Sequence, residues 1–70
     1  MIRQTVSSSN IRSIGYDTKI QTLEIEFQDG GIYQYFNIPE SIYNALMSAS
    51  SYGSYFHRYI KDQYQWTKIQ

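Results

Sequence analysis

The sequence predicts an α+β fold, in which a three-stranded antiparallel β-meander is followed by two short helices packed on one face and a short C-terminal strand. Apolar and polar residues alternate in the first half of the chain, as is typical of half-buried strands. In the second half, apolar residues recur with the spacing of amphipathic helices. The 70 residues include no cysteine, so we expect one small domain, spanning 1–70, that depends on its apolar core.

A hairpin over 23–36 is the centre of this prediction. A tight turn within it contains an Asp-Gly pair, which is a strong hairpin signal. The strand before the turn places three apolar residues on one face and three polar residues on the other, namely Leu23, Ile25 and Phe27 against Glu24, Glu26 and Gln28.

The length of the loop decides on which face the two tyrosines of the second strand lie. A three-residue loop over 28–30, with its glycine in the left-handed conformation, pairs Ile25 with Tyr33 and Leu23 with Tyr35. A two-residue loop would instead place both tyrosines among the glutamates. We favour the longer loop because it gives one apolar and one polar face, and a slip of one residue would exchange the faces of every side chain.

The first strand of the meander is predicted over 11–16. Ile14 and Tyr16 share a face there, and Gly15 between them indicates a bulge or the close approach of another backbone. The chain before this strand ends in a small polar run without a pattern, and we expect part of 1–6 to fray.

Two helices are predicted to cover the apolar face of the sheet. The first begins with Pro39 at the first helical position, where its missing N–H costs nothing, and Ser50 or Ser51 can cap the second. The segment 64–69 alternates again and predicts a short last strand or an extended tail over the core. The apolar stripes are Ile42, Ala45, Leu46 and Ala49 in the first helix, and Tyr52, Tyr55, Phe56, Tyr59 and Ile60 in the second.

The formal net charge is zero, with six basic and six acidic residues. Nucleic-acid-binding domains are usually basic, so this balance lowers the expectation of such a partner without excluding a local basic patch. No apolar run resembles a signal peptide or approaches the ~20 residues of a membrane span. We therefore expect a soluble cytoplasmic protein with no membrane partner.

No group of residues indicates catalysis. His57, the only histidine, is expected on the solvated face of the second helix, without a nucleophile and an orienting carboxylate beside it. Glu24 and Glu26 lie roughly 6–7 Å apart along one strand, and we interpret them as a polar face rather than as paired catalytic carboxylates. No phosphate-binding glycine loop or metal-ligand spacing is present. We predict a protein that is not an enzyme and that uses neither a cofactor nor a metal.

One group of residues has the chemistry of a binding patch. His57, Arg58 and Lys61 lie close together on the second helix, near two tyrosines, and basic groups beside aromatic rings can bind phosphates and bases. We favour a structural role for these residues over a binding role, because cations near the end of a helix complement its dipole and Asp62 partly neutralises them.

The order of several short motifs resembles the KTSC domain family. The central Tyr33-Gln34-Tyr35 resembles the Y-x-Y motif of that family, and the likeness spans 6–69. His57 departs from it, because a polar residue such as asparagine is expected at that position. The other matching segments are Ser8–Ile11, Ile14–Asp17, Leu23–Phe27 with Gly30, Ile38–Pro39, and Gly53–Phe56 followed by Ile60 and Tyr64.

The resemblance implies a small α+β domain that occurs at the C-terminus of some lysyl-tRNA synthetases and as free-standing proteins of bacteria and their phages. It suggests RNA binding and brings no catalytic residues. Our hypothesis is a non-catalytic binding module for RNA such as tRNA, in which the three basic residues contact phosphates. Tyr33 or Tyr35 would stack on bases only if exposed, and the loop parity favours packing in the core for both. The alternative is a protein-interaction module with no nucleic-acid role, using a sheet edge or the tyrosine-rich surface.

Overall fold

The hairpin register follows the loop parity. In the computed structural model, which describes residues 1–70, Ile25 pairs with Tyr33 and Leu23 with Tyr35. Gly30 has φ 95°, the left-handed conformation that the three-residue loop requires, and its N–H donates to the carbonyl of Phe27 at 2.9 Å. The predicted apolar and polar faces of the hairpin are confirmed.

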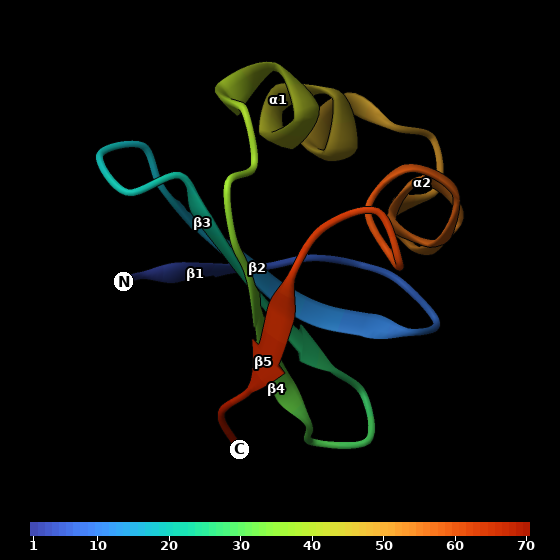
Figure 1. Cartoon of the computed structure of the whole chain (residues 1–70). Coiled ribbons are helices and arrows are strands. Elements are labelled where there is room, and N and C mark those ends of the chain that lie inside the picture. Colours follow the sequence, from blue (N-terminus) through green and yellow to red (C-terminus); the bar gives the residue numbers. More distant parts are fainter.

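The hairpin is the centre of a five-stranded antiparallel sheet in which neighbours along the chain are neighbours in space (Figure 1). The predicted three-stranded meander with one further strand is wrong in detail, because residues at the N-terminus form an additional edge strand. The strands are β1 (Arg3–Thr5), β2 (Ile11–Asp17), β3 (Thr22–Phe27), β4 (Ile32–Tyr35) and β5 (Trp66–Lys68).

β2 contains a bulge at Arg12 that alternation alone does not reveal. Ile11 pairs with Phe27 and Ser13 with Glu26, so Arg12 has no residue opposite it. The extra residue shifts the alternation by one, and both isoleucines of this strand therefore point into the core although they are three residues apart. A strictly regular strand would have turned one of them to the other face.

Gly15 marks the close approach of a second backbone rather than the bulge. A Cβ atom at this position would lie 2.8 Å from the carbonyl oxygen of Ile2 and 3.0 Å from a side-chain carbon of Arg3. Glycine therefore allows β1 to pack against β2 at this point.

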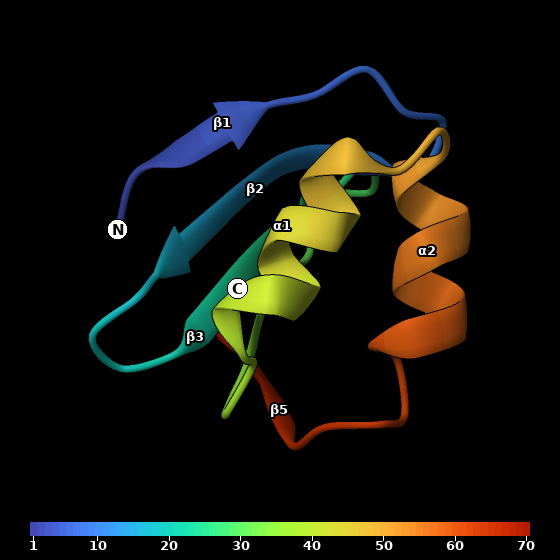
Figure 2. The ribbon, with the colours of Figure 1, turned by 90° about the horizontal axis from the view of Figure 1, so that it is seen from above.

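Both helices lie on the same face of the sheet (Figures 1 and 2). α1 (Glu40–Ser48) begins one residue later than predicted, with Pro39 preceding it. α2 (Tyr52–Tyr59) is capped by Ser51, whose hydroxyl accepts from the N–H of Ser54 at 3.2 Å, as expected for one of the two candidate serines. The core between helices and sheet consists of Ile11, Ile14, Leu23, Ile25, Tyr35, Ile38, Leu46, Phe56 and Ile60.

The predicted stripe of α2 is only partly buried. Phe56 and Ile60 lie in the core, whereas Tyr59 is 48% exposed. Tyr59 packs instead beside Tyr55 at 4.6 Å between ring centroids, on the surface of the helix. Because Phe56 and Ile60 face the sheet, Tyr59 lies at the margin of the buried stripe and not at its centre.

The other face of the sheet carries a polar network. Glu24 is only 6% exposed, and its carboxylate accepts hydrogen bonds from Gln34 at 2.9 Å and from the guanidinium of Arg3. Ser13 lies between the charges, since its hydroxyl accepts from Arg3 and donates to Glu26, both at 2.9 Å. The network joins β1 to β2, β3 and β4.

After α2 the chain returns to the sheet. Asp62 adopts a left-handed conformation, with φ 65°, and β5 then pairs with β4. The predicted last strand therefore lies at the edge of the sheet next to the Y-x-Y strand. No helix is long and apolar enough to cross a membrane.

Candidate functional site

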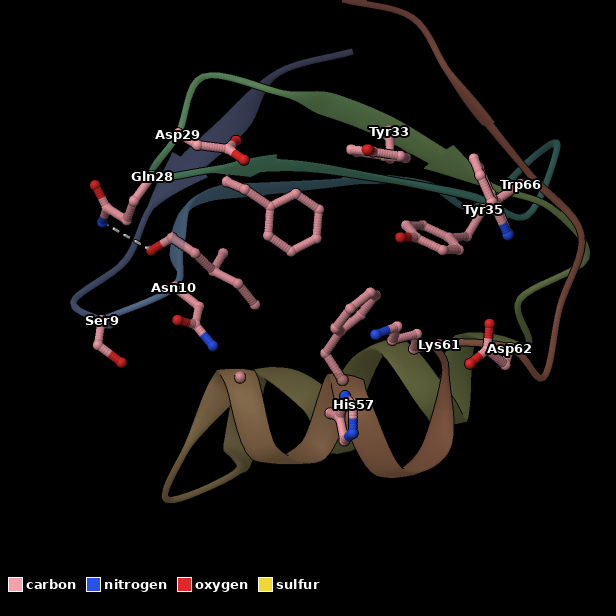
Figure 3. A pocket seen from close by; sticks show the side chains of 14 residues that line it. Ser9, Asn10, Gln28, Asp29, Tyr33, Tyr35, His57, Lys61, Asp62 and Trp66 are labelled. Atoms are coloured by element: carbon pink, nitrogen blue, oxygen red, sulfur yellow. Dashed lines mark hydrogen bonds between the residues drawn. The ribbon is translucent and has the colours of Figure 1, made fainter.

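A cavity of about 570 Å³ opens between the sheet and α2 (Figure 3). Strands β3 and β4 and the beginning of β5 form its upper wall, and α2 with the turn after it forms the lower wall. Its volume lies in the range of pockets that bind small organic molecules. The aromatic residues that line it are Phe27, Tyr33, Tyr35, Phe56 and Trp66.

These aromatic rings pack against one another mainly by their edges. Phe56 from α2 meets Phe27 and Tyr35 in edge contacts, with centroids 5.4 and 5.2 Å apart. Tyr33 meets Phe27 at 5.5 Å and Trp66 at 5.5 Å. Such contacts fix the rings and leave ring surface facing the cavity.

One end of the cavity combines aromatic and charged groups. Tyr35, Lys61, Asp62 and Trp66 lie at this end (Figure 3). The turn at Asp62 brings them together, because it directs the chain from the last turn of α2 back to the edge strand beside Tyr35. Trp66 is 52% exposed, so a large flat ring is accessible there.

Tyr35 is buried in this wall, with only 5% of its surface exposed. Burial, together with the nearby Tyr33 and the negative charge of Asp62, raises the pKa of Tyr35 to about 12. Among the tyrosines only Tyr16 has a hydrogen-bonded hydroxyl, which donates to the carbonyl of Ile38. The hydroxyl of Tyr35 therefore stays protonated and points toward the cavity without a partner in the protein (Figure 3).

The opposite end of the cavity is polar, and hydrogen bonds within the protein hold its side chains. The amide of Gln28 donates to the carbonyls of Ser8 and Ile11 at 3.1 and 3.2 Å. The carboxylate of Asp29 accepts from the N–H of Gly31 at 2.9 Å, which fixes it within its own turn. The polar groups at this end thus serve mainly to shape the loops.

The structure brings four of the five predicted site residues together. Tyr33, Tyr35, His57 and Lys61 all line the cavity, and the Y-x-Y tyrosines face the helices as the loop parity predicts. Arg58 lies outside it, with its guanidinium carbon 5.8 Å from the ring centroid of Tyr59. The binding role of these five residues stays a prediction.

The remaining cations are divided between the two faces of the sheet. Lys68 on β5 places its ammonium nitrogen 5.9 Å from the ring centroid of Tyr33, beside the cavity. Arg12 lies on the other face, where its guanidinium meets Glu26 at 3.8 Å. No three histidine, aspartate or glutamate side chains are grouped as they would be around a metal ion.

Sequence reasoning missed Trp66 as a lining residue of the cavity. The alternation over 64–69 predicts a short strand or tail that contains Trp66, but it does not identify the partner strand. The signal was present, because alternation after Gln63 places Trp66 and Lys68 on one face. Phe27 and Phe56 were assigned to the core, where they also form walls of the cavity.

Comparison with known proteins agrees with this architecture. The family model described as "KTSC domain" matches residues 7–64. The chain belongs to the KTSC domain family. The crystal structure of a KTSC domain protein from Yersinia pestis is 46% identical and has a TM-score of 0.96, over 99% of this chain and 97% of that one.

Other relatives place the KTSC domain in two settings. A protein of Stutzerimonas stutzeri is 41% identical over 64 residues, which are 91% of this chain and 90% of that protein. A lysine–tRNA ligase of a Nostoc species is 39% identical over 61 residues. The KTSC match covers 87% of this chain but only 11% of the ligase, so the likeness concerns a small part of that enzyme. No catalytic family is indicated for the KTSC domain.

Proposed function

We propose that this protein is a non-catalytic RNA-binding module that holds unpaired nucleotides in the cavity between α2 and the edge of the sheet. The observation that carries the proposal is the combination, in one cavity, of an exposed tryptophan with an ammonium group. Trp66 offers a flat ring on which a base can stack, and Lys61 offers a cation for the adjoining phosphate.

The distribution of ion pairs supports this assignment. Every ion pair between side chains involves Arg3 or Arg12 with a glutamate on the other face of the sheet. Lys61 and Lys68 thus have no carboxylate partner within salt-bridge distance. A zero net charge is therefore compatible with cations available at the cavity.

The lysine–tRNA ligase relatives favour tRNA as the RNA to test first. A small part of those enzymes resembles 87% of this chain, and a module beside a tRNA-binding enzyme would gain from RNA contacts of its own. We extend the proposal to tRNA on this ground and place the activity in the cytoplasm.

The test is an amide-shift titration of the labelled protein with bulk tRNA at about 50 and about 200 mM salt. We expect shifts at the cavity, above all at Tyr33, Lys61 and Trp66, that weaken at the higher salt. Lys61→Glu should reduce the affinity about tenfold or more, because it replaces a phosphate contact by repulsion.

Arg58→Glu is the matched control, since it makes the same charge change one helical turn away and outside the cavity. It should change the affinity less than about threefold. Equal losses in the two variants would move the interface to the outer surface of α2. An absence of shifts at low salt and near-millimolar protein would rule out RNA binding.

The second candidate is a protein-interaction module, and the free edge of β5 favours it. β5 is the last strand of the sheet, so one side of its backbone has no strand partner. Ile69 beside it is half-exposed. A peptide that extends the sheet would bind here, and its affinity would depend little on salt.

A further inference from the structure

The unpartnered hydroxyl of Tyr35, which faces the interior of the cavity, has a consequence for the kind of base that fits (Figure 3). Tyr35 is anchored by its ring, which packs against Phe56 at 5.2 Å and lies in the core. Its hydroxyl has no hydrogen-bond partner in the protein and reaches the cavity (Figure 3). A polar group that a buried ring holds in a fixed position discriminates between ligands that do and do not complete its hydrogen bond.

Two charged groups lie near Tyr35 (Figure 3). Asp62 and Lys61 follow one another in the turn after α2, and both line the cavity. Asp62 belongs to no ion pair and no hydrogen bond ties down its carboxylate, in contrast to Asp29, which is held in its own turn. The carboxylate of Asp62 can therefore accept hydrogen bonds from a ligand, and the hydroxyl of Tyr35 and the ammonium group of Lys61 can donate them.

We propose, on the basis of the RNA-binding function above, that this end of the cavity recognises the edge of a guanine. Guanine carries a carbonyl oxygen next to two N–H donors. The hydroxyl of Tyr35 donates to the carbonyl, and the carboxylate of Asp62 accepts from the adjacent N–H groups. The ring of the base lies against Trp66.

The other bases match this arrangement less well. Adenine and cytosine present a ring-nitrogen lone pair beside their amino group, and a carboxylate facing that lone pair is repelled. Uracil offers one N–H donor where guanine offers two. Guanine is thus the base that satisfies the hydroxyl and both oxygens of the carboxylate together.

The experiment compares four short RNAs, UUGUU, UUAUU, UUCUU and UUUUU, by amide-shift titration. Trp66 is the only tryptophan of the chain, so quenching of its fluorescence reports stacking independently. We expect UUGUU to bind about tenfold tighter than the other three, which is the usual size of one well-made base contact. Tyr35→Phe and Asp62→Asn should each reduce this preference to less than about threefold.

Both variants suit the fold. Phenylalanine keeps the buried ring and loses a hydroxyl that has no partner, and asparagine tolerates the left-handed backbone of residue 62. Equal binding of all four RNAs, or a preference that survives both substitutions, would overturn the guanine assignment while RNA binding itself stands. Binding of none of the four, together with no response to tRNA, would overturn both.

Discussion

Three tyrosines on the helix-covered face of the sheet show how one residue type serves different purposes. Tyr16 stacks on Tyr43 of α1, with centroids 4.6 Å apart, and donates to the carbonyl of Ile38. Tyr33 lies at the side of the cavity, and Tyr35 forms its buried wall. Only the hydroxyl of Tyr16 thus contributes a hydrogen bond to the fold.

This difference predicts unequal effects of the same substitution. Tyr16→Phe removes the donor to a carbonyl beside the core and should lower the free energy of unfolding by about 1 kcal/mol. Tyr35→Phe removes no hydrogen bond and should lower it by less than about 0.5 kcal/mol at pH 7. Urea unfolding of the two variants in parallel measures both, and equal losses would show that Tyr35 has a partner in solution.

Glu24 predicts how the stability responds to acid. Burial alone would raise its pKa, but the hydrogen bonds from Gln34 and Arg3 and the charge of Arg3 outweigh burial and lower the pKa. The folded protein therefore binds fewer protons than the unfolded chain around pH 4. The stabilisation is present above the ordinary carboxyl pKa of about 4.3 and is lost as the pH falls through the lower folded value.

Glu24→Gln tests this prediction. At pH 7 we expect the variant to be less stable by about 1–2 kcal/mol, since the bond from Arg3 loses its charged acceptor. The difference from the wild type should shrink as the pH is lowered from 7 to 3 in a series of urea unfolding curves. Glu40→Gln, at an exposed carboxylate outside the network, is the control with a much smaller effect at pH 7. A difference that stays constant with pH would mean that Glu24 contributes through packing alone.

At the scale of elements, β1 depends on Gly15. Ala at this position would place its Cβ 2.8 Å from the carbonyl oxygen of Ile2, so one of the two strands must move. We expect Gly15→Ala to detach β1, to increase hydrogen exchange in Arg3–Thr5, and to lower the stability by about 1–2 kcal/mol. The increase in hydrogen exchange should be confined to β1, and the amides of β3 and β4 should stay protected from exchange.

Gly53→Ala provides a matched control for that experiment. Its Cβ would have its nearest neighbour, the Asn10 amide, at 3.4 Å, which is an ordinary contact. Because alanine favours a helix over glycine, this variant should stabilise α2 by up to about 1 kcal/mol. Unchanged exchange of β1 in Gly15→Ala would contradict the proposed close packing.

The elements that sequence reasoning found are those whose signals are local. Loop parity predicted the pairing of Ile25 with Tyr33, and a capping serine predicted the start of α2. The strand β1 and the bulge at Arg12 lack such signals, because they depend on partners distant in sequence. Part of the cavity was missed for the same reason: Trp66 reaches Tyr33 only through the pairing of β5 with β4.

At the scale of the whole molecule, the two faces of the sheet carry charge in different ways. The open face pairs Arg3 and Arg12 with Glu24 and Glu26, so its charges are largely satisfied within the protein. The covered face keeps unpaired lysines beside an aromatic cavity. The formal charge of zero is therefore a sum over both faces, and the face that a ligand would meet still carries unpaired cations.

This arrangement predicts a shallow dependence of RNA binding on salt. Lys61 lines the cavity and Lys68 lies beside it, so about two phosphates can be neutralised there. For single-stranded RNA two such contacts give a slope of log K against log salt of about −1.4. Affinity then depends mainly on stacking and hydrogen bonding.

Titrations of a short single-stranded RNA at several salt concentrations measure the slope. Lys61→Ala should make the slope shallower by about 0.7, and Arg58→Ala should leave it unchanged. A wild-type slope steeper than about −3 would require more cations than the cavity offers, and the binding surface would then have to extend over the exposed side of α2.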